Sequence, residues 1–213
     1  ADVYVNDIFL GTHTGGFTEF SFDITPYLNV KGEQKLVVKV ADSSDKSFQP
    51  RGKQVLSPKG IWYTPVSGIW QSVWLETVPE TRFLSYEAVA DIDTKSLTVK
   101  TLTKGTAEGD IILAEVLEGG VGYSPEKPAE KVIASAKAAE GKAVTVTLPE
   151  VKTWSPDSPY LYGLRLSVIR GGKVLDRVEG YAAMREISVV TDSHNYKRMA
   201  LNGKPLFQFG PLD

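Results

Sequence analysis

The stretch "LYGLRLSVIRGGKVLDRVEGY", residues 161–181, contains two alternating apolar runs on either side of Gly171-Gly172. Alternation with a period of two residues is typical of a β-strand with one face buried. A Gly-Gly pair supplies the positive backbone φ angles that a two-residue hairpin loop needs. The stretch therefore predicts an antiparallel hairpin and indicates that the chain around it is a β-sheet protein.

Further strand-like runs precede this hairpin, and Gly, Pro and Asp turns separate them at spacings typical of a β-sandwich. The runs are "SLTVKTL" (96–102), "DIILAEVL" (110–117) and "KAVTVTL" (142–148). One segment, residues 125–142, has two interpretations. Pro128 near its start, its many Ala and Lys residues and Gly141 at its end favour a helix. Its alternation and the β-rich surroundings favour a strand, which is the prediction retained.

The first part of the chain also alternates. "DVYV" and "IFLG" flank Asn6-Asp7, a pair able to form a tight hairpin turn, and "KLVVKV" (35–40) reads as a half-buried antiparallel strand. In "GIWYTPVSGIWQSVWLE", residues 60–76, the apolar residues from 69 onward fall on both faces of an expected strand. Trp70 and Trp74 are therefore expected in core or interdomain packing.

Composition bounds the class of protein. The chain has 213 residues, 42% hydrophobic and 23% charged, with a net charge of −2 and no cysteine. One or two soluble domains fit this composition, whereas disulfides and thiolate metal sites are excluded. Acidic and basic residues are interspersed, so nucleic-acid binding has no support. No apolar run approaches the roughly 18 residues of a membrane span, and no signal peptide is present.

Motifs for cofactor chemistry are missing from the sequence. His13 and His194 lie far apart and neither has a second ligand at helical spacing, so both are expected to be solvated loop residues and no metal is expected. There is no Gly-rich phosphate loop and no Gly-x-Ser-x-Gly elbow. We therefore expect no cofactor.

Carboxylates raise the question of a paired-carboxylate glycosidase. The candidates in the first half are Glu19, Asp23, Asp42 and Asp45. Asp23, in "FDITPYL", is better interpreted as a turn or cap residue that accepts backbone N–H groups. Asp42 and Asp45 lie in a polar loop after a strand, where acidic residues are common. No catalytic residue is assigned.

Trp62 and Tyr63 lie in a loop framed by Gly60 and Pro65. Such a loop can hold an exposed ring in place, and loops carry binding function. A ring face stacks well on the C–H face of a pyranose. Contact with a sugar and simple packing therefore both remain open for these two residues.

At this point the motifs resemble a known family. "VYVNDIFLGTHTGGFTEFSFDITPYL" (3–28) followed by "GEQKLVVKV" (32–40) resembles the sugar-binding jelly roll of glycoside hydrolase family 2, although Asp7 and Gln34 stand where the family usually has Gly and Asn. "SGIWQSVWLE" resembles the closing strand of that domain. "WSPDSPYLYGLRLSVIRGGKVLDRVEGY" (154–181) is similar to the end of the family's immunoglobulin-like domain, and "LNGKPLFQFG" (201–210) to the entry of its (β/α)8 barrel.

The resemblance implies an all-β chain with two β-sandwich domains. Residues 1–79 would be a jelly roll without its first strands, residues 80–183 an immunoglobulin-like sandwich, and residues 184–213 a linker and the start of the catalytic barrel. The family's acid/base and nucleophile glutamates lie on barrel strands, so this fragment is expected to be inactive. An unpaired sheet edge near residues 2–12 would favour self-association, which leaves a homo-oligomer open.

The resemblance also adds candidate substrate-binding residues. In several β-galactosidase-like members an aspartate five positions before the small residue of "S-G-I" reaches the sugar site, and here that position holds Trp62. "QPRGKQ" (49–54) resembles a loop of large bacterial members, where Arg51 would bind an acidic sugar or an interdomain carboxylate. The candidates are thus Trp62, Tyr63 and Arg51.

The implied parent protein is a retaining glycosidase of the β-galactosidase type. The alternatives are a β-glucuronidase or β-mannosidase of the same family, or a stand-alone carbohydrate-binding or adhesion module. The expected partners are a carbohydrate substrate and the protein's own catalytic barrel, without nucleic acid or membrane. A periplasmic or secreted bacterial location is expected, with the cytoplasm as the alternative.

Overall fold

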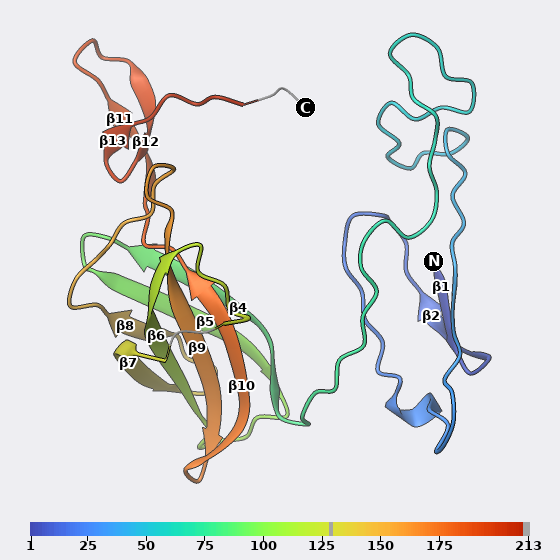
Figure 1. Ribbon diagram of the computed structural model, residues 1–213, viewed down its shortest axis with the longest axis horizontal. Helices are drawn as coiled ribbons and strands as arrows, with labels where there is room; N and C mark the ends of the chain where they lie inside the picture. The colour runs from blue at the N-terminus through green and yellow to red at the C-terminus, as the bar shows by residue number, and fades with distance from the viewer. Residues whose placement is uncertain (128–129, 211–213) are drawn as a thin grey trace. The chain divides into compact units, whose positions relative to one another are not determined.

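The computed structural model describes residues 1–127 and 130–210 (Figure 1). Its internal contacts divide the chain into two compact units, Ala1–Glu76 and Thr77–Asp213, which we call unit 1 and unit 2. No helix among the described residues is long and apolar enough to cross a bilayer.

Unit 1 contains one small antiparallel sheet with the strand order β2-β1-β3. The strands are β1 (Asp2–Val5), β2 (Ile8–Thr12) and β3 (Leu36–Lys39), and a short 3-10 helix, η1, covers Thr25–Tyr27. Asn6 and Asp7 have φ angles of 49° and 64°, so the predicted tight turn between β1 and β2 is confirmed. The Asn6 side chain also donates to Gln34 Oε1 at 2.7 Å, which ties this turn to the start of β3.

The strand predicted over residues 69–75 is wrong. Residues 64–80 form no strand, and the rings of Trp70 and Trp74 are 68% and 70% exposed rather than packed in a core. An extended segment becomes a strand only where a neighbour takes up its backbone N–H and C=O groups. Among the described residues no strand lies beside this segment. The Trp70 indole instead donates to the Gly16 carbonyl oxygen at 2.8 Å.

Unit 2 is built around two antiparallel sheets (Figure 1). One sheet has the order β4-β5-β8 and the other β10-β9-β6-β7. The strands are β4 (Arg82–Asp91), β5 (Ser96–Lys104), β6 (Ile111–Val121), β7 (Val132–Ala139), β8 (Val144–Thr147), β9 (Tyr160–Arg170) and β10 (Lys173–Ala182). A three-strand sheet facing a four-strand sheet in this order is the arrangement of an immunoglobulin-like sandwich.

Alternating residues of both sheets fill a single core. Leu97 and Val99 of β5 enter it from one sheet, and Leu164 and Leu166 of β9 enter it from the other. All four side chains are at most 1% exposed. This is the period-two pattern expected from the sequence, and burial of these side chains supplies the main drive for unit 2 to fold.

Two local predictions in unit 2 are confirmed. Gly171 and Gly172 have φ angles of 55° and 80° and connect β9 to β10 as a tight hairpin. Residues 132–139 form strand β7, so the strand interpretation of this segment holds and the helix does not. Pro128, which supported the helix, lies outside the described residues.

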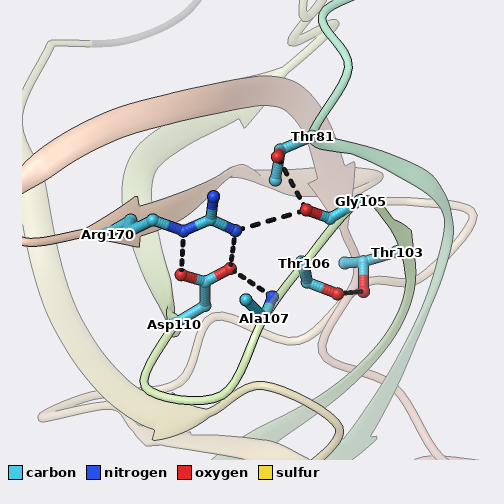
Figure 2. A network of polar contacts seen from close by, with 7 residues as sticks. All are labelled: Thr81, Thr103, Gly105, Thr106, Ala107, Asp110 and Arg170. Atoms are coloured by element: carbon cyan, nitrogen blue, oxygen red, sulfur yellow. Dashed lines mark hydrogen bonds and ion pairs between the residues drawn. The ribbon is translucent and has the colours of Figure 1, made fainter.

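A polar network closes the turn between β5 and β6 (Figure 2). The Arg170 guanidinium donates Nε to Asp110 Oδ1 and Nη2 to Asp110 Oδ2, both at 2.7 Å. Asp110 Oδ2 also accepts the backbone N–H of Ala107 at 2.8 Å. The Gly105 carbonyl oxygen accepts hydrogen bonds from Arg170 and from the Thr81 hydroxyl. The network thus fastens the end of β9 to the β5–β6 turn.

The C-terminal part of unit 2 is a small antiparallel sheet of β11 (Ile187–Thr191), β12 (Lys197–Leu201) and β13 (Lys204–Pro205). Asn202 and Gly203, with φ angles of 52° and 74°, form the turn between β12 and β13. The strand after this turn, β13, ends at Pro205. Assignment of segments 1–79, 80–183 and 184–213 to three family domains remains a prediction.

Candidate functional site

The three candidate residues Trp62, Tyr63 and Arg51 all lie in one irregular loop region of unit 1, residues 42–67 (Figure 1, blue-green). Its only β-type pairing is an isolated bridge between Gln54 and Tyr63. The Tyr63 N–H donates to the Lys53 carbonyl at 2.8 Å, and the Val55 N–H donates to the Tyr63 carbonyl at 3.0 Å. Two chain segments therefore run side by side here, which fixes the backbone of the aromatic pair.

Asp42 and Ser67 join the two ends of this region. Asp42 Oδ2 accepts the Ser67 hydroxyl at 2.8 Å, and Oδ1 accepts the Ser44 N–H at 2.8 Å and Gln49 Nε2 at 2.6 Å. The hydrogen bonds from the Ser44 backbone, Ser67 and Gln49 hold the pKa of the Asp42 carboxyl below its ordinary value. Asp42 is therefore an ionised acceptor at neutral pH.

Two further side chains hold the interior of the region. Asp45 Oδ2 accepts the Leu56 N–H at 3.0 Å, and Gln54 Oε1 accepts the Val66 N–H at 2.8 Å. Short polar side chains that bond to the backbone replace a sheet ladder in this way. The region is consequently shaped by side chains even though it contains no strand.

Trp62 lines an open hollow of about 640 Å³ in this region. The other lining residues are Asp45, Lys46, Val55, Leu56, Ser57 and Lys59. Trp62 is 41% exposed, so the residue is neither buried in a core nor fully open to solvent. The lining thus combines three apolar side chains, of Val55, Leu56 and Trp62, with charged and polar ones, and a contact surface for a small polar molecule needs both kinds.

The structure places the other two candidates differently. Arg51 lies beside the hollow, where its Nη1 donates to the Asp45 backbone carbonyl at 2.9 Å. Tyr63 does not line the hollow, although its ring is 63% exposed next to Trp62. Arg51 therefore contacts Asp45, which lines the same hollow as Trp62, while Tyr63 is exposed outside that lining.

Three of the four carboxylates considered for catalysis, Asp23, Asp42 and Asp45, accept hydrogen bonds with a structural role. Asp23 Oδ1 accepts the Thr25 N–H at 3.0 Å, which confirms the predicted turn role. Asp42 and Asp45 hold backbone groups as described above.

The structure also places one of the two histidines: His13 stacks on Phe20 with ring centroids 4.3 Å apart. No group of three His, Asp or Glu residues within the described parts of the chain could hold a metal ion.

Sequence reasoning did not assign the structural roles of several residues in this region. Asp42 and Gln54 hold the region, and Lys46 and Lys59 line the hollow with Trp62. The sequence predicts a polar loop around Asp42 and Asp45, but only the path of the folded chain reveals that Asp42 meets Ser67. No local pattern signals a contact between residues 25 positions apart.

Comparison with known proteins decides the family. The sequence pattern of the glycosyl hydrolases family 2 matches residues 80–185, which correspond to the sandwich of unit 2. The chain belongs to glycosyl hydrolase family 2. Family 2 relatives align over nearly the whole chain, and a β-galactosidase from Thermoanaerobacter pseudethanolicus is 29% identical over 213 residues, or 97% of this chain. A β-glucuronidase from Formosa agariphila is 27% identical over 209 residues and covers 91% of it.

The solved structures agree on the fold. A β-glucuronidase structure from Ruminococcus gnavus superimposes with a TM-score of 0.73 at 21% identity, over 98% of this family 2 chain. The chain spans 26% of the Thermoanaerobacter protein, 21% of the Formosa protein and 34% of the Ruminococcus chain. It therefore matches only a part of each of these three proteins.

Proposed function

We propose that this chain is a non-catalytic, sugar-facing part of a retaining glycoside hydrolase that acts on β-linked sugars, of the β-galactosidase type. Family membership supports a hydrolase as the parent protein, and two of the relatives named above are a β-galactosidase and a β-glucuronidase. The observation that carries the sugar-facing role is the half-exposed Trp62 ring beside an open hollow on a braced loop.

Retaining hydrolysis of a β-glycoside needs two carboxyl groups about 5–5.5 Å apart, one as nucleophile and one as acid and base. On this proposal both belong to a catalytic barrel beyond the sequence considered, and unit 1 contributes binding. An indole face attracts the C–H face of a pyranose and excludes water from it. Trp62 would thus orient the sugar, while the sandwich of unit 2 would support the barrel.

Two alternatives predict different sugars or no chemistry. A β-glucuronidase would present a cation to the sugar carboxylate, and Arg51, Lys46 and Lys59 lie at or beside the hollow. A β-mannosidase would differ in the barrel and its loops. A stand-alone carbohydrate-binding or adhesion module would bind glycans with no catalytic barrel attached.

The proposed partners are a carbohydrate substrate and the protein's own catalytic barrel, with no nucleic acid or membrane. A homo-oligomer is compatible with the exposed edge of β2. A periplasmic or secreted bacterial location, with the cytoplasm as the alternative, is part of the same proposal because the parent would act on sugars from outside the cell.

A sugar titration of the 213-residue chain tests the proposal. Methyl β-galactoside, methyl β-glucuronide and methyl β-mannoside are added at millimolar concentrations while the indole N–H signals are followed by NMR. We expect the Trp62 signal to shift, and Trp62→Ala to weaken binding by about 1–3 kcal/mol, because ring burial and stacking are lost. Trp74→Ala is the matched control, since its ring is exposed outside the hollow. No shift with any of the three sugars would refute the sugar-facing role.

A further inference from the structure

The loop that carries Trp62 and Tyr63 has a glycine with a positive φ angle at each end. Gly60 has a φ of 57° and Gly68 a φ of 120°, and both lie in a region that residues with a side chain rarely adopt. Between them no strand ladder fixes the chain. Something other than regular secondary structure must therefore hold the two rings in place.

The Asp42 carboxylate is placed to do this. It accepts three hydrogen bonds, all between 2.6 and 2.8 Å, from Ser44, Gln49 and Ser67. Two of these donors lie in the loop that follows Asp42, and the third lies just before Gly68. One side chain thus joins the beginning and the end of the region across 25 residues of sequence.

We propose that Asp42 is a positioning residue, which fixes Trp62 and Tyr63 through its bond to Ser67. Ser67 follows Val66, whose N–H is held by Gln54, and Gln54 pairs in turn with Tyr63. Anchoring Ser67 therefore limits the freedom of the whole segment from Gly60 to Gly68. Asp42 has no place in the lining of the hollow, so it acts on a sugar only through the rings.

The consequence for binding is preorganisation. A ring already held in its binding position loses less conformational freedom when a sugar arrives, so the complex is tighter. This consequence rests on the proposed sugar-facing function, but the effect of Asp42 on the loop does not. The two can therefore be tested separately on the same protein.

Hydrogen exchange tests the effect on the loop. The amides of Tyr63 and Val66 donate to Lys53 O and Gln54 Oε1, and their exchange is measured by NMR in the full chain. Asp42→Ala and Ser67→Ala should each speed exchange of both amides by about tenfold, because a hydrogen bond to a charged group is lost. Amides of β9 should be unchanged. Ser67→Thr, which keeps the hydroxyl, should retain protection, and Ser72→Ala is the matched control.

Sugar affinity tests the positioning role by a double-mutant cycle. If Asp42 acts through Trp62, then Trp62→Ala weakens binding at least about fivefold in the wild type and by less than about twofold in Asp42→Ala. Equal losses in both backgrounds would overturn the inference, as would unchanged exchange at Tyr63 and Val66 in Ser67→Ala. Faster exchange in a chain that binds none of the three sugars would uphold the positioning of the rings and refute only the proposed function.

Discussion

The side chains of Arg170 and Asp110 form a bidentate ion pair, with two N–H···O bonds of 2.7 Å (Figure 2). The Asp110 carboxylate is 0% exposed, whereas the Arg170 side chain is 45% exposed. The pair joins the end of β9 to the β5–β6 turn. Its hydrogen bonds, first from Arg170 and then from the Ala107 N–H, lower the pKa of Asp110 from 3.8 to about 2.

The first prediction concerns pH. Because the folded chain binds a proton at Asp110 less readily than the unfolded chain, the contribution of Asp110 to stability is present above pH 3.8 and is lost as pH falls toward 2. Denaturant unfolding between pH 5 and 2 should therefore show a steeper acid loss in wild type than in Asp110→Asn. Asp157→Asn, at an exposed position, should keep the wild-type slope. Equal slopes for wild type and Asp110→Asn would contradict the prediction.

Gly105 gives a second prediction, for stability. Its φ is +74°, and an added Cβ would lie 2.5 Å from the Glu80 carbonyl oxygen. Gly105→Ala should destabilise the chain by about 2–4 kcal/mol, because backbone strain and a clash with main chain add together. Gly109→Ala is the matched control: its φ is +90° but nothing lies within 4 Å. Thermal unfolding measures the stability of both variants. Equal losses of stability in Gly105→Ala and Gly109→Ala would show that the clash with Glu80 is relieved, and would contradict the prediction.

Arg51 distinguishes the candidate sugars. Its guanidinium holds the Asp45 carbonyl, so Arg51→Ala should loosen the hollow and weaken galactoside and glucuronide binding to a similar extent, about two- to fivefold for one hydrogen bond. Titration by NMR with both methyl glycosides measures this. A loss for the glucuronide alone would instead assign Arg51 to the sugar carboxylate and favour the β-glucuronidase alternative. Lys53→Ala, in the same loop but outside the hollow lining, is the control.

The chain alone should not hydrolyse nitrophenyl β-galactoside, β-glucuronide or β-mannoside. Asp42 and Asp45 are engaged with backbone groups, and the proposed catalytic pair lies elsewhere. Release of nitrophenol is followed by absorbance over hours. Glycosidase activity that co-elutes with the protein in two different chromatography steps would contradict the proposal of a non-catalytic role.

The edge of the unit 1 sheet gives a fifth prediction. β2 is an edge strand, and its Ile8 and Phe9 side chains are 46% and 53% exposed. Such an edge can pair with a second copy of the chain. Light scattering should show self-association at high concentration, and Ile8→Lys should reduce it. Val30→Lys, at a position 99% exposed but outside any strand, should not.

Local pattern predicted the fold of unit 2 but only part of unit 1. The β9–β10 hairpin depends on residues adjacent in sequence, so alternation and Gly171-Gly172 were sufficient to predict it. Residues 69–75 have the same alternation, yet they form no strand because no described strand pairs with them. A strand forms only when a second segment accepts and donates its backbone hydrogen bonds. The pattern of one segment does not show whether such a partner lies beside it in the fold.

The sequence singles out the aromatic residues of the candidate loop, but it does not show the contacts that hold them. Trp62 and Tyr63 stand out because glycine and proline frame them. The bond between Asp42 and Ser67 depends on how the chain returns on itself, which neither segment encodes alone. The role of Arg51 was left open by the sequence, and the structure adds its contact with the Asp45 backbone.

The pairing of β6 with β9 also affects how the protein is made. Ile111 lies opposite Ile169 in the sheet. The long stretch of chain between them must therefore be closed into a loop before β6 and β9 can form their hydrogen bonds. Closing such a stretch costs entropy and slows folding. During synthesis, the edge of β6 that pairs with β9 stays unpaired until β9 leaves the ribosome, and an unpaired strand edge is prone to aggregation.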